Sequence, residues 1–256
     1  MKRTLIPVGF LAVIFAGFLS FYEANYRVPI LMYHHVGYTR EKSSVYVSPK
    51  TFERQMEFLS MHNYHVMPLA ELAMLVRARK RVPFNTVVIT FDDGNADNIQ
   101  YAFPILKKLH LPATVFMITS NINKYGWLAE EDLKIMDEAG VTIGSHTVNH
   151  AYLPDLDEAN ALLELKESQR RLEDILGHPV TLFSYPAGGF TEHVRSLVEN
   201  AGYAAALTTN RGRTKNDPYA LRRVKISDAG GNLFSFWAKI SGLYHVGKRT
   251  IDVPEY

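Results

Sequence analysis

Two adjacent carboxylates offer the clearest chemistry in this sequence. Asp92 and Asp93 follow the apolar, β-branched run 86–89, which is typical of a buried strand, and Gly94 comes next. Successive strand side chains face opposite ways and glycine permits a turn, so the two acids are predicted to point in different directions. One could bind a metal ion while the other moves protons. A surface turn would explain this run on its own, so a second motif is needed.

The second motif is a pair of histidines. His146 and His150 follow another short strand-like segment, 141–145. On one helical turn, imidazoles four residues apart share a face and can bind one divalent ion. An aspartate with two histidines leaves coordination positions open for water and substrate, as a catalytic metal requires. The sequence therefore predicts one divalent ion. We expect zinc, although nitrogen and oxygen donors suit cobalt, nickel and iron equally.

Together the two motifs, Thr-Phe-Asp-Asp-Gly at 90–94 and His-Thr-Val-Asn-His at 146–150, resemble the first two signature motifs of the polysaccharide deacetylases, carbohydrate esterase family 4. The two motifs have the order and separation found in that family, and the resemblance extends over about residues 28–226. It implies one general base and three metal ligands. The base corresponds to Asp92, and the ligands correspond to Asp93, His146 and His150.

The later family motifs differ from the commoner pattern. Many members carry an Arg-Pro-Pro-Tyr-Gly-like motif whose arginine orients the base, but here Ser184 occupies that arginine position. Many also carry a late Leu-x-His that supplies the general acid, and none is present around 206–209. Taken alone, these differences would indicate a degenerate site. A branch that deacetylates poly-β-1,6-N-acetylglucosamine, an exopolysaccharide, accounts for both.

That branch carries a Tyr-His near its first strand and a Pro-Arg-Val-like strand near its end. The resemblance places the general acid at His34 and a late arginine at Arg223, which we infer pairs with Asp92. Adjacent strand side chains face opposite ways, so His35 is predicted to be a structural or rim residue. A shift of one residue in the register would exchange the roles of His34 and His35.

The sugar site is predicted around 184–188, the stretch that matches the family's third motif. The resemblance assigns substrate contacts to Tyr185, Pro186, Ala187 and Gly188. Ala187 lacks the usual aromatic side chain, although its backbone N–H could still stabilise an oxyanion. Trp127 has two interpretations of equal weight: an aromatic platform for a sugar ring, or a residue that covers the core.

These residues must be positioned by alternating strands and helices. The strands are expected at 28–33, 64–66, 86–92, 113–118, 141–145, 181–184, 203–207 and 223–226, and the helices at 49–62, 69–79, 102–109, 129–139, 156–176, 192–201 and about 233–237. This α/β alternation favours a parallel barrel with active residues at the carboxyl ends of its strands. An open, doubly wound sheet would have the same periodicity. The resemblance implies a distorted, incomplete (β/α) barrel.

Composition indicates one catalytic domain, 26–256, which we expect to be a monomer. The 256 residues are 47% hydrophobic, and a net charge of +2 gives no reason to expect a nucleic-acid partner. The absence of cysteine excludes disulfides, thiolate ligands and thiol nucleophiles. Lys2 and Arg3 precede the uncharged run 5–22, so 1–25 is predicted to be an uncleaved signal anchor in a bacterial cell membrane. A cleaved signal peptide, giving a secreted protein, is the alternative; either places the catalytic domain outside the cell.

The resulting hypothesis is an enzyme that removes N-acetyl groups from an extracellular N-acetylglucosamine-containing polysaccharide and releases acetate. Peptidoglycan, chitin and xylan are alternative substrates for the same fold and metal. A non-catalytic glycan-binding module is a rival of another class. The presence of a base beside a complete ligand set argues against it, because binding alone needs no base.

Overall fold

Seven parallel strands close into a barrel. The computed structural model describes residues 16–17, 19–22, 26–40, 43–209, 217–228, 232–244 and 246. Around the barrel the strand order is β1-β10-β9-β8-β7-β6-β5, and β1 closes the ring by pairing with β5. The barrel strands are β1 Ile30–Tyr33, β5 Thr86–Phe91, β6 Ala113–Met117, β7 Val141–Ser145, β8 Leu182–Ser184, β9 Ala205–Thr208 and β10 Leu221–Lys225. β4, His65–Val66, pairs with the first two residues of β5. Outside the barrel, β2, His35–Val36, pairs with β3, Tyr46–Val47.

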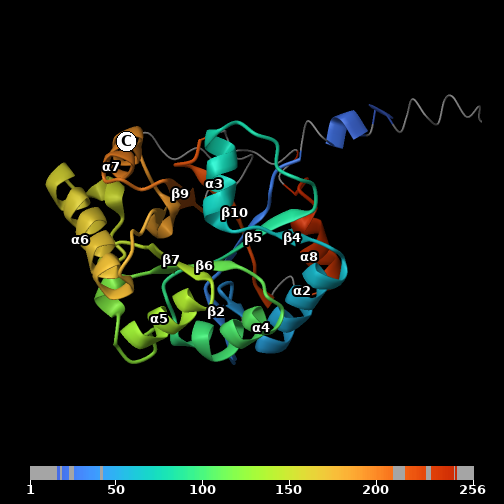
Figure 1. Ribbon diagram of the computed structural model, residues 1–256, viewed down its shortest axis with the longest axis horizontal. Coiled ribbons are helices and arrows are strands. Elements are labelled where there is room, and N and C mark those ends of the chain that lie inside the picture. The colour runs from blue at the N-terminus through green and yellow to red at the C-terminus, as the bar shows by residue number, and fades with distance from the viewer. Residues whose placement is uncertain are drawn as a thin grey trace, which may run out of the picture.

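Helices surround the strands, as Figure 1 shows. The α-helices are α2 Pro49–Met61, α3 Leu69–Arg77, α4 Phe103–Lys108, α5 Glu130–Glu138, α6 Glu158–Leu176, α7 Glu192–Asn200 and α8 Leu233–Ile240. Short helical turns lie at η1 Asn98–Ala102, η2 Thr119–Asn121, η3 Leu153–Asp155 and η4 Pro186–Gly188. Local sequence sets their ends. Ser48 caps α2 by accepting from the backbone N–H of Thr51, with Pro49 at the first helical position, and Gly177 ends α6 in the left-handed conformation at φ 76°.

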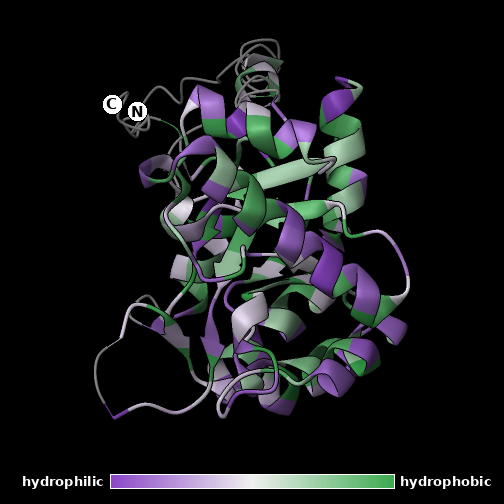
Figure 2. Ribbon diagram, turned by 90° about the vertical axis from the view of Figure 1, so that its left-hand side faces the viewer, coloured by the Kyte–Doolittle hydropathy of each residue, from purple (hydrophilic) through white to green (hydrophobic). Residues whose placement is uncertain are grey.

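The core follows from the hydrophobic pattern of the strands. Every residue of β1, β5 and β6 is buried, because one face packs inside the barrel and the other packs under the helices. In Figure 2 the helices carry hydrophobic and hydrophilic residues along their length, as amphipathic helices do. The predicted barrel of alternating strands and helices is confirmed. One helix differs, since the segment predicted at 102–109 begins earlier, with the π-helical turn η1.

Two terminal predictions have different outcomes. The predicted anchor run, 5–22, lies largely outside the described residues. Among the residues that the structure does describe, no helix has the length and apolar character needed to cross a membrane. The predicted C-terminal helix is present as α8, which buries Phe236 and Ile240 against the barrel and exposes Phe234 and Trp237.

Candidate active site

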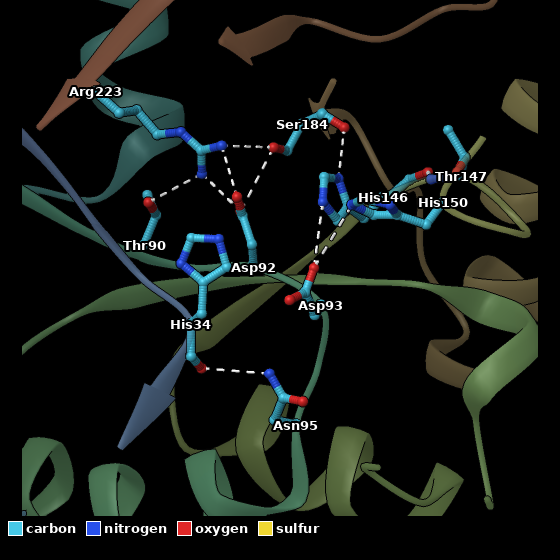
Figure 3. A network of polar contacts seen from close by, with 11 residues as sticks. His34, Thr90, Asp92, Asp93, Asn95, His146, Thr147, His150, Ser184 and Arg223 are labelled. Atoms are coloured by element: carbon cyan, nitrogen blue, oxygen red, sulfur yellow. Dashed lines mark hydrogen bonds and ion pairs between the residues drawn. The ribbon is translucent and has the colours of Figure 1, made fainter. Parts of the chain in front are cut away.

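The two aspartates after β5 diverge, as predicted. Asp92 is 2% exposed and points into the barrel, whereas Asp93 is half-buried and faces the histidines (Figure 3). The divergence arises because Asp93 and Gly94 adopt left-handed φ angles of 74° and 83°. The left-handed φ at position 94 favours glycine, and a side chain there would also displace the Met117 side chain.

The two histidines come together, although not on a helix. Residues 146–150 are irregular, and Thr147 and His150 have left-handed φ angles of 66° and 56°. The prediction of a helical turn is therefore wrong. A left-handed residue after β7 reverses the chain, and this brings the two imidazole centroids to 4.8 Å from each other.

Asp93, His146 and His150 form a donor set that fits a divalent ion. Asp93 Oδ1 lies 3.6 Å from His146 Nε2 and 3.8 Å from His150 Nε2, and one donor atom from each residue lies within 4.8 Å of the others. His146 Nδ1 lies 2.7 Å from the carbonyl oxygen of Ser184. Since a carbonyl only accepts, Nδ1 carries the proton and the Nε2 lone pair is left for a metal. The His150 side chain is 41% exposed, which gives the site an open side.

Asp92 is held by a buried arginine. Arg223, on β10, donates from Nη1 and Nη2 to the two carboxylate oxygens of Asp92 at 2.6 and 2.7 Å, and its side chain is fully buried. Ser184 Oγ accepts from Arg223 Nη2 at 2.9 Å and lies 3.4 Å from Asp92 Oδ1 (Figure 3). The pairing inferred from the sequence is present. The guanidinium reaches Asp92 from β10 rather than from position 184.

This contact determines the ionisation of Asp92. Burial alone would raise the pKa of the Asp92 carboxyl, but the charge of Arg223, and then that of His146, act in the opposite direction. The net pKa of Asp92 lies well below the ordinary aspartate value. Asp92 is therefore a carboxylate at neutral pH.

His34 faces this carboxylate and His35 does not. The His34 ring lies beside Asp92 at the end of β1 in Figure 3, and its Nδ1 is buried without a hydrogen-bond partner in the described part of the chain. Burial lowers the pKa of His34, and the nearby Asp92 and Asp93 partly oppose that shift. The His35 ring instead bonds Asp97 at 2.7 Å and stacks on Tyr46. The predicted register is correct, and the catalytic role of His34 stays a prediction.

Two asparagines and an aspartate, which the sequence analysis did not single out, hold this segment. Asn98 Nδ2 donates to the carbonyl oxygen of His34 at 2.9 Å, and Asn95 Nδ2 approaches the same oxygen at 3.5 Å. Asp97 accepts from the backbone N–H of Val36. The only sequence signal for this network was its position directly after Gly94, because polar residues in a loop are common.

The predicted sugar wall needs a correction at Tyr185. Its side chain is fully buried, its hydroxyl donates to the carbonyl oxygen of Tyr219, and its ring stacks on Phe190, so it belongs to the core. Burial raises the pKa of Tyr185 as well. A side chain with no exposed surface cannot contact a sugar.

Of the other predicted substrate residues, only Ala187 and Trp127 have exposed or partly exposed side chains. Pro186 and Gly188 are buried, which leaves Ala187 as the exposed residue of η4, at φ 52°. Trp127 is half-buried and pairs through its backbone with Asn95, next to the aspartate turn. Its place beside the site is compatible with both interpretations of Trp127.

We expect Arg223→Lys to lose activity and stability together. A lysine ammonium lacks the planar fork that bonds both oxygens of Asp92 side by side, so the carboxylate would lose its fixed orientation and its pKa would rise. Arg223→Met should cost more, about 3–5 kcal/mol of unfolding free energy, because it leaves a buried carboxylate unpaired. Denaturant unfolding and kcat/KM measure both effects.

A matched control lies on α7. Arg195 also makes a two-pronged contact, with Asp217, but that pair is partly exposed and lies outside the site. Arg195→Met should leave the activity unchanged. Wild-type kcat/KM in Arg223→Lys would show that Arg223 has no part in orienting the base.

Comparisons with known proteins identify the family. The model of the polysaccharide deacetylase family matches residues 79–206, which is half of the chain. YxkH of Bacillus subtilis (strain 168), whose own assignment as a polysaccharide deacetylase is provisional, is 35% identical over 207 residues, 80% of this chain and 73% of that protein. The chain belongs to the polysaccharide deacetylase family.

Two further relatives support this deacetylase assignment. The poly-β-1,6-N-acetyl-D-glucosamine N-deacetylase of Staphylococcus aureus (strain MRSA252) is 26% identical over 206 residues, 74% of this chain and 71% of that protein. The solved structure of the Streptococcus pyogenes deacetylase PplD in complex with acetate has a TM-score of 0.78 at 26% identity, and covers 83% of this chain and 97% of that one. The barrel is thus the deacetylase fold. Two of the predicted site residues, His34 and Arg223, lie outside the 79–206 match.

Proposed function

We propose that this deacetylase removes N-acetyl groups from an extracellular polysaccharide that contains N-acetylglucosamine, and that it uses a divalent ion to do so. One observation carries the proposal. A carboxylate, Asp92, lies directly beside a donor set of two histidines and Asp93 but is itself held by Arg223. A glycan-binding module would need no ionised, oriented base next to a metal site.

Each residue of the site has a separate role in the proposed reaction. Asp93, His146 and His150 would hold the ion, which when bound polarises the acetamide carbonyl and lowers the pKa of its water. Asp92 accepts a proton from the attacking water, and Arg223 keeps it ionised and oriented. The backbone N–H of Ala187 donates to the developing oxyanion. His34 protonates the amine as the C–N bond breaks, and acetate and a free glucosamine residue leave.

The substrate is proposed to be poly-β-1,6-N-acetylglucosamine or a closely similar exopolysaccharide. The support is the use of His34 and Arg223 in place of the commoner acid and arginine, together with the relative from Staphylococcus aureus that is named for this activity. Acetate release from a panel of this polymer, peptidoglycan, chitin oligomers and acetylated xylan tests the proposal. If peptidoglycan, chitin oligomers or acetylated xylan is turned over faster than this polymer, that glycan is the substrate and the proposal is wrong.

We further propose that 26–256 is one monomeric catalytic domain outside the cell, held at the membrane by 1–25. The support is the uncharged run 5–22 behind Lys2 and Arg3. Fractionation of cells that express the full chain tests this. Recovery of the full-length protein in the cytoplasm would contradict it, and recovery from the medium would indicate cleavage.

Removal of the metal is expected to stop acetate release. His146→Ala and His150→Ala should each lose the ion, because each removes one of three donors. The measurement is metal content after dialysis, together with acetate release with and without a chelator and after readdition of Zn²⁺. His178→Ala is the control, since His178 bonds Asp137 on the protein surface and no donor of the site. Full metal occupancy in either site variant would refute the ligand assignment.

A further inference from the structure

A buried glutamate on α6 contacts the loop that carries both histidines. Glu164 Oε2 accepts from the backbone N–H groups of Val148 and Asn149 at 2.8 and 2.9 Å, and Glu164 Oε1 accepts from Asn149 Nδ2 at 2.7 Å. The residue is 9% exposed. One carboxylate thus satisfies three donors, all of them between His146 and His150, although it is no ligand itself.

The loop needs this support because its backbone is strained. Thr147 is β-branched and has a φ of 66°, a conformation that such residues rarely adopt and that costs on the order of 1–3 kcal/mol. Its hydroxyl oxygen is also buried without a hydrogen-bond partner in the described part of the chain. Left-handed φ at this position is what turns His150 back toward His146.

Contacts from two sides hold the strained conformation. On one side, the backbone N–H groups of Thr119 and Ser120 donate to the carbonyl oxygens of Thr147 and Val148 at 3.2 and 2.9 Å. On the other side, Glu164 takes the N–H groups of the same loop. The first set belongs to the backbone and depends on no side chain. The second depends on a single carboxylate, so one substitution can remove it.

We propose that Glu164 is the positioning residue that holds His146 and His150 in the geometry for metal binding. This inference rests on the proposed metal site. Without Glu164 the loop keeps its two imidazoles but loses the acceptors that offset its strain. Part of the free energy of metal binding would then be used to order the loop. Residues behind the ligands typically change metal affinity by 10–100-fold when they are removed, and we expect a loss of about this size.

The test is a Co²⁺ titration followed by visible absorption, with wild type, Glu164→Ala and Glu164→Gln. Glutamine keeps the size of the side chain but directs an N–H₂ group at donors, so it should also raise the Co²⁺ dissociation constant by roughly 10–100-fold. Glu167→Gln is the matched control. Glu167 lies one turn further along α6, is exposed and pairs with Arg170, so its removal should leave the constant unchanged.

Thermal unfolding of the metal-free proteins separates positioning from a purely structural role. If Glu164 only stabilises the fold, the metal-free variants unfold at lower temperature and their Co²⁺ dissociation constant stays within about twofold of wild type, which would overturn the proposal. Glu164→Gln decides the matter if the alanine variant does not fold. Failure of wild type to bind Co²⁺ would instead refute the metal site itself.

Discussion

Asp92→Asn is expected to reduce deacetylation by at least about 10²–10⁴-fold while metal uptake is retained. An amide cannot accept the proton of the attacking water, and Asp92 is no member of the donor set. The measurements are kcat/KM for acetate release and metal content after dialysis. Asp93→Asn is the matched comparison, because the neighbouring carboxylate is a predicted ligand and its loss should weaken metal binding. An active Asp92→Asn variant would mean that the base is elsewhere.

The same substitution should lower stability in a way that depends on pH. In wild type the pKa of Asp92 is depressed by Arg223, so the contribution of the pair to stability is present above the ordinary value of 3.8 and is lost as the pH falls below it. Asp92→Asn lacks this contribution at every pH. The difference in unfolding free energy between the two proteins should therefore be largest near neutrality and should shrink in acid.

His34→Ala is expected to lower turnover of an N-acetylated oligosaccharide by roughly 10²–10⁴-fold, the usual effect of losing a positioned general acid. The ion should remain bound, since His34 is outside the donor set. An amine must be protonated in order to leave, whereas the alcohol of an activated acetyl ester leaves more easily. The defect should therefore be smaller on the ester. Steady-state kinetics with both substrates measure this difference.

His35→Ala is the control on the neighbouring residue. Its ring bonds Asp97 and stacks on Tyr46, so its removal should affect stability more than turnover. An inactive His35→Ala variant beside a fully active His34→Ala variant would reverse the two assignments. If neither variant slows the enzyme, the general acid does not come from the segment that follows β1.

The strands and the turn at the two aspartates could be predicted because their sequence signals lie within a few neighbouring residues. The run before Asp92 is β-branched and apolar, and a glycine after two acids indicates a turn. The contact between Asp92 and Arg223 joins residues 131 positions apart. No periodicity in the sequence connects them, and the pairing could be inferred only from the resemblance to a known family.

The errors have a common cause, which is that they depend on tertiary contacts. The histidine loop was predicted as helical because four-residue spacing is the helical signal, and nothing local marks Thr147 as left-handed. Tyr185 was assigned to the sugar site by its place in a motif, but its partner Tyr219 comes from a distant segment. Glu164 had one usable signal. It lies within the apolar stripe of α6, between the buried Ala161 and Leu165.

The order of the barrel strands in the chain determines when the contacts of the site can form during synthesis. β1 pairs with β5 on one side and with β10 on the other, so His34 lies between the strands that supply Asp92 and Arg223. The metal donors all precede residue 151 in the chain, whereas β10 is the last barrel strand to leave the ribosome. A nascent chain therefore contains all three predicted ligands before it contains the guanidinium that bonds Asp92. The contact between Asp92 and Arg223 can form only after β10 has been synthesised.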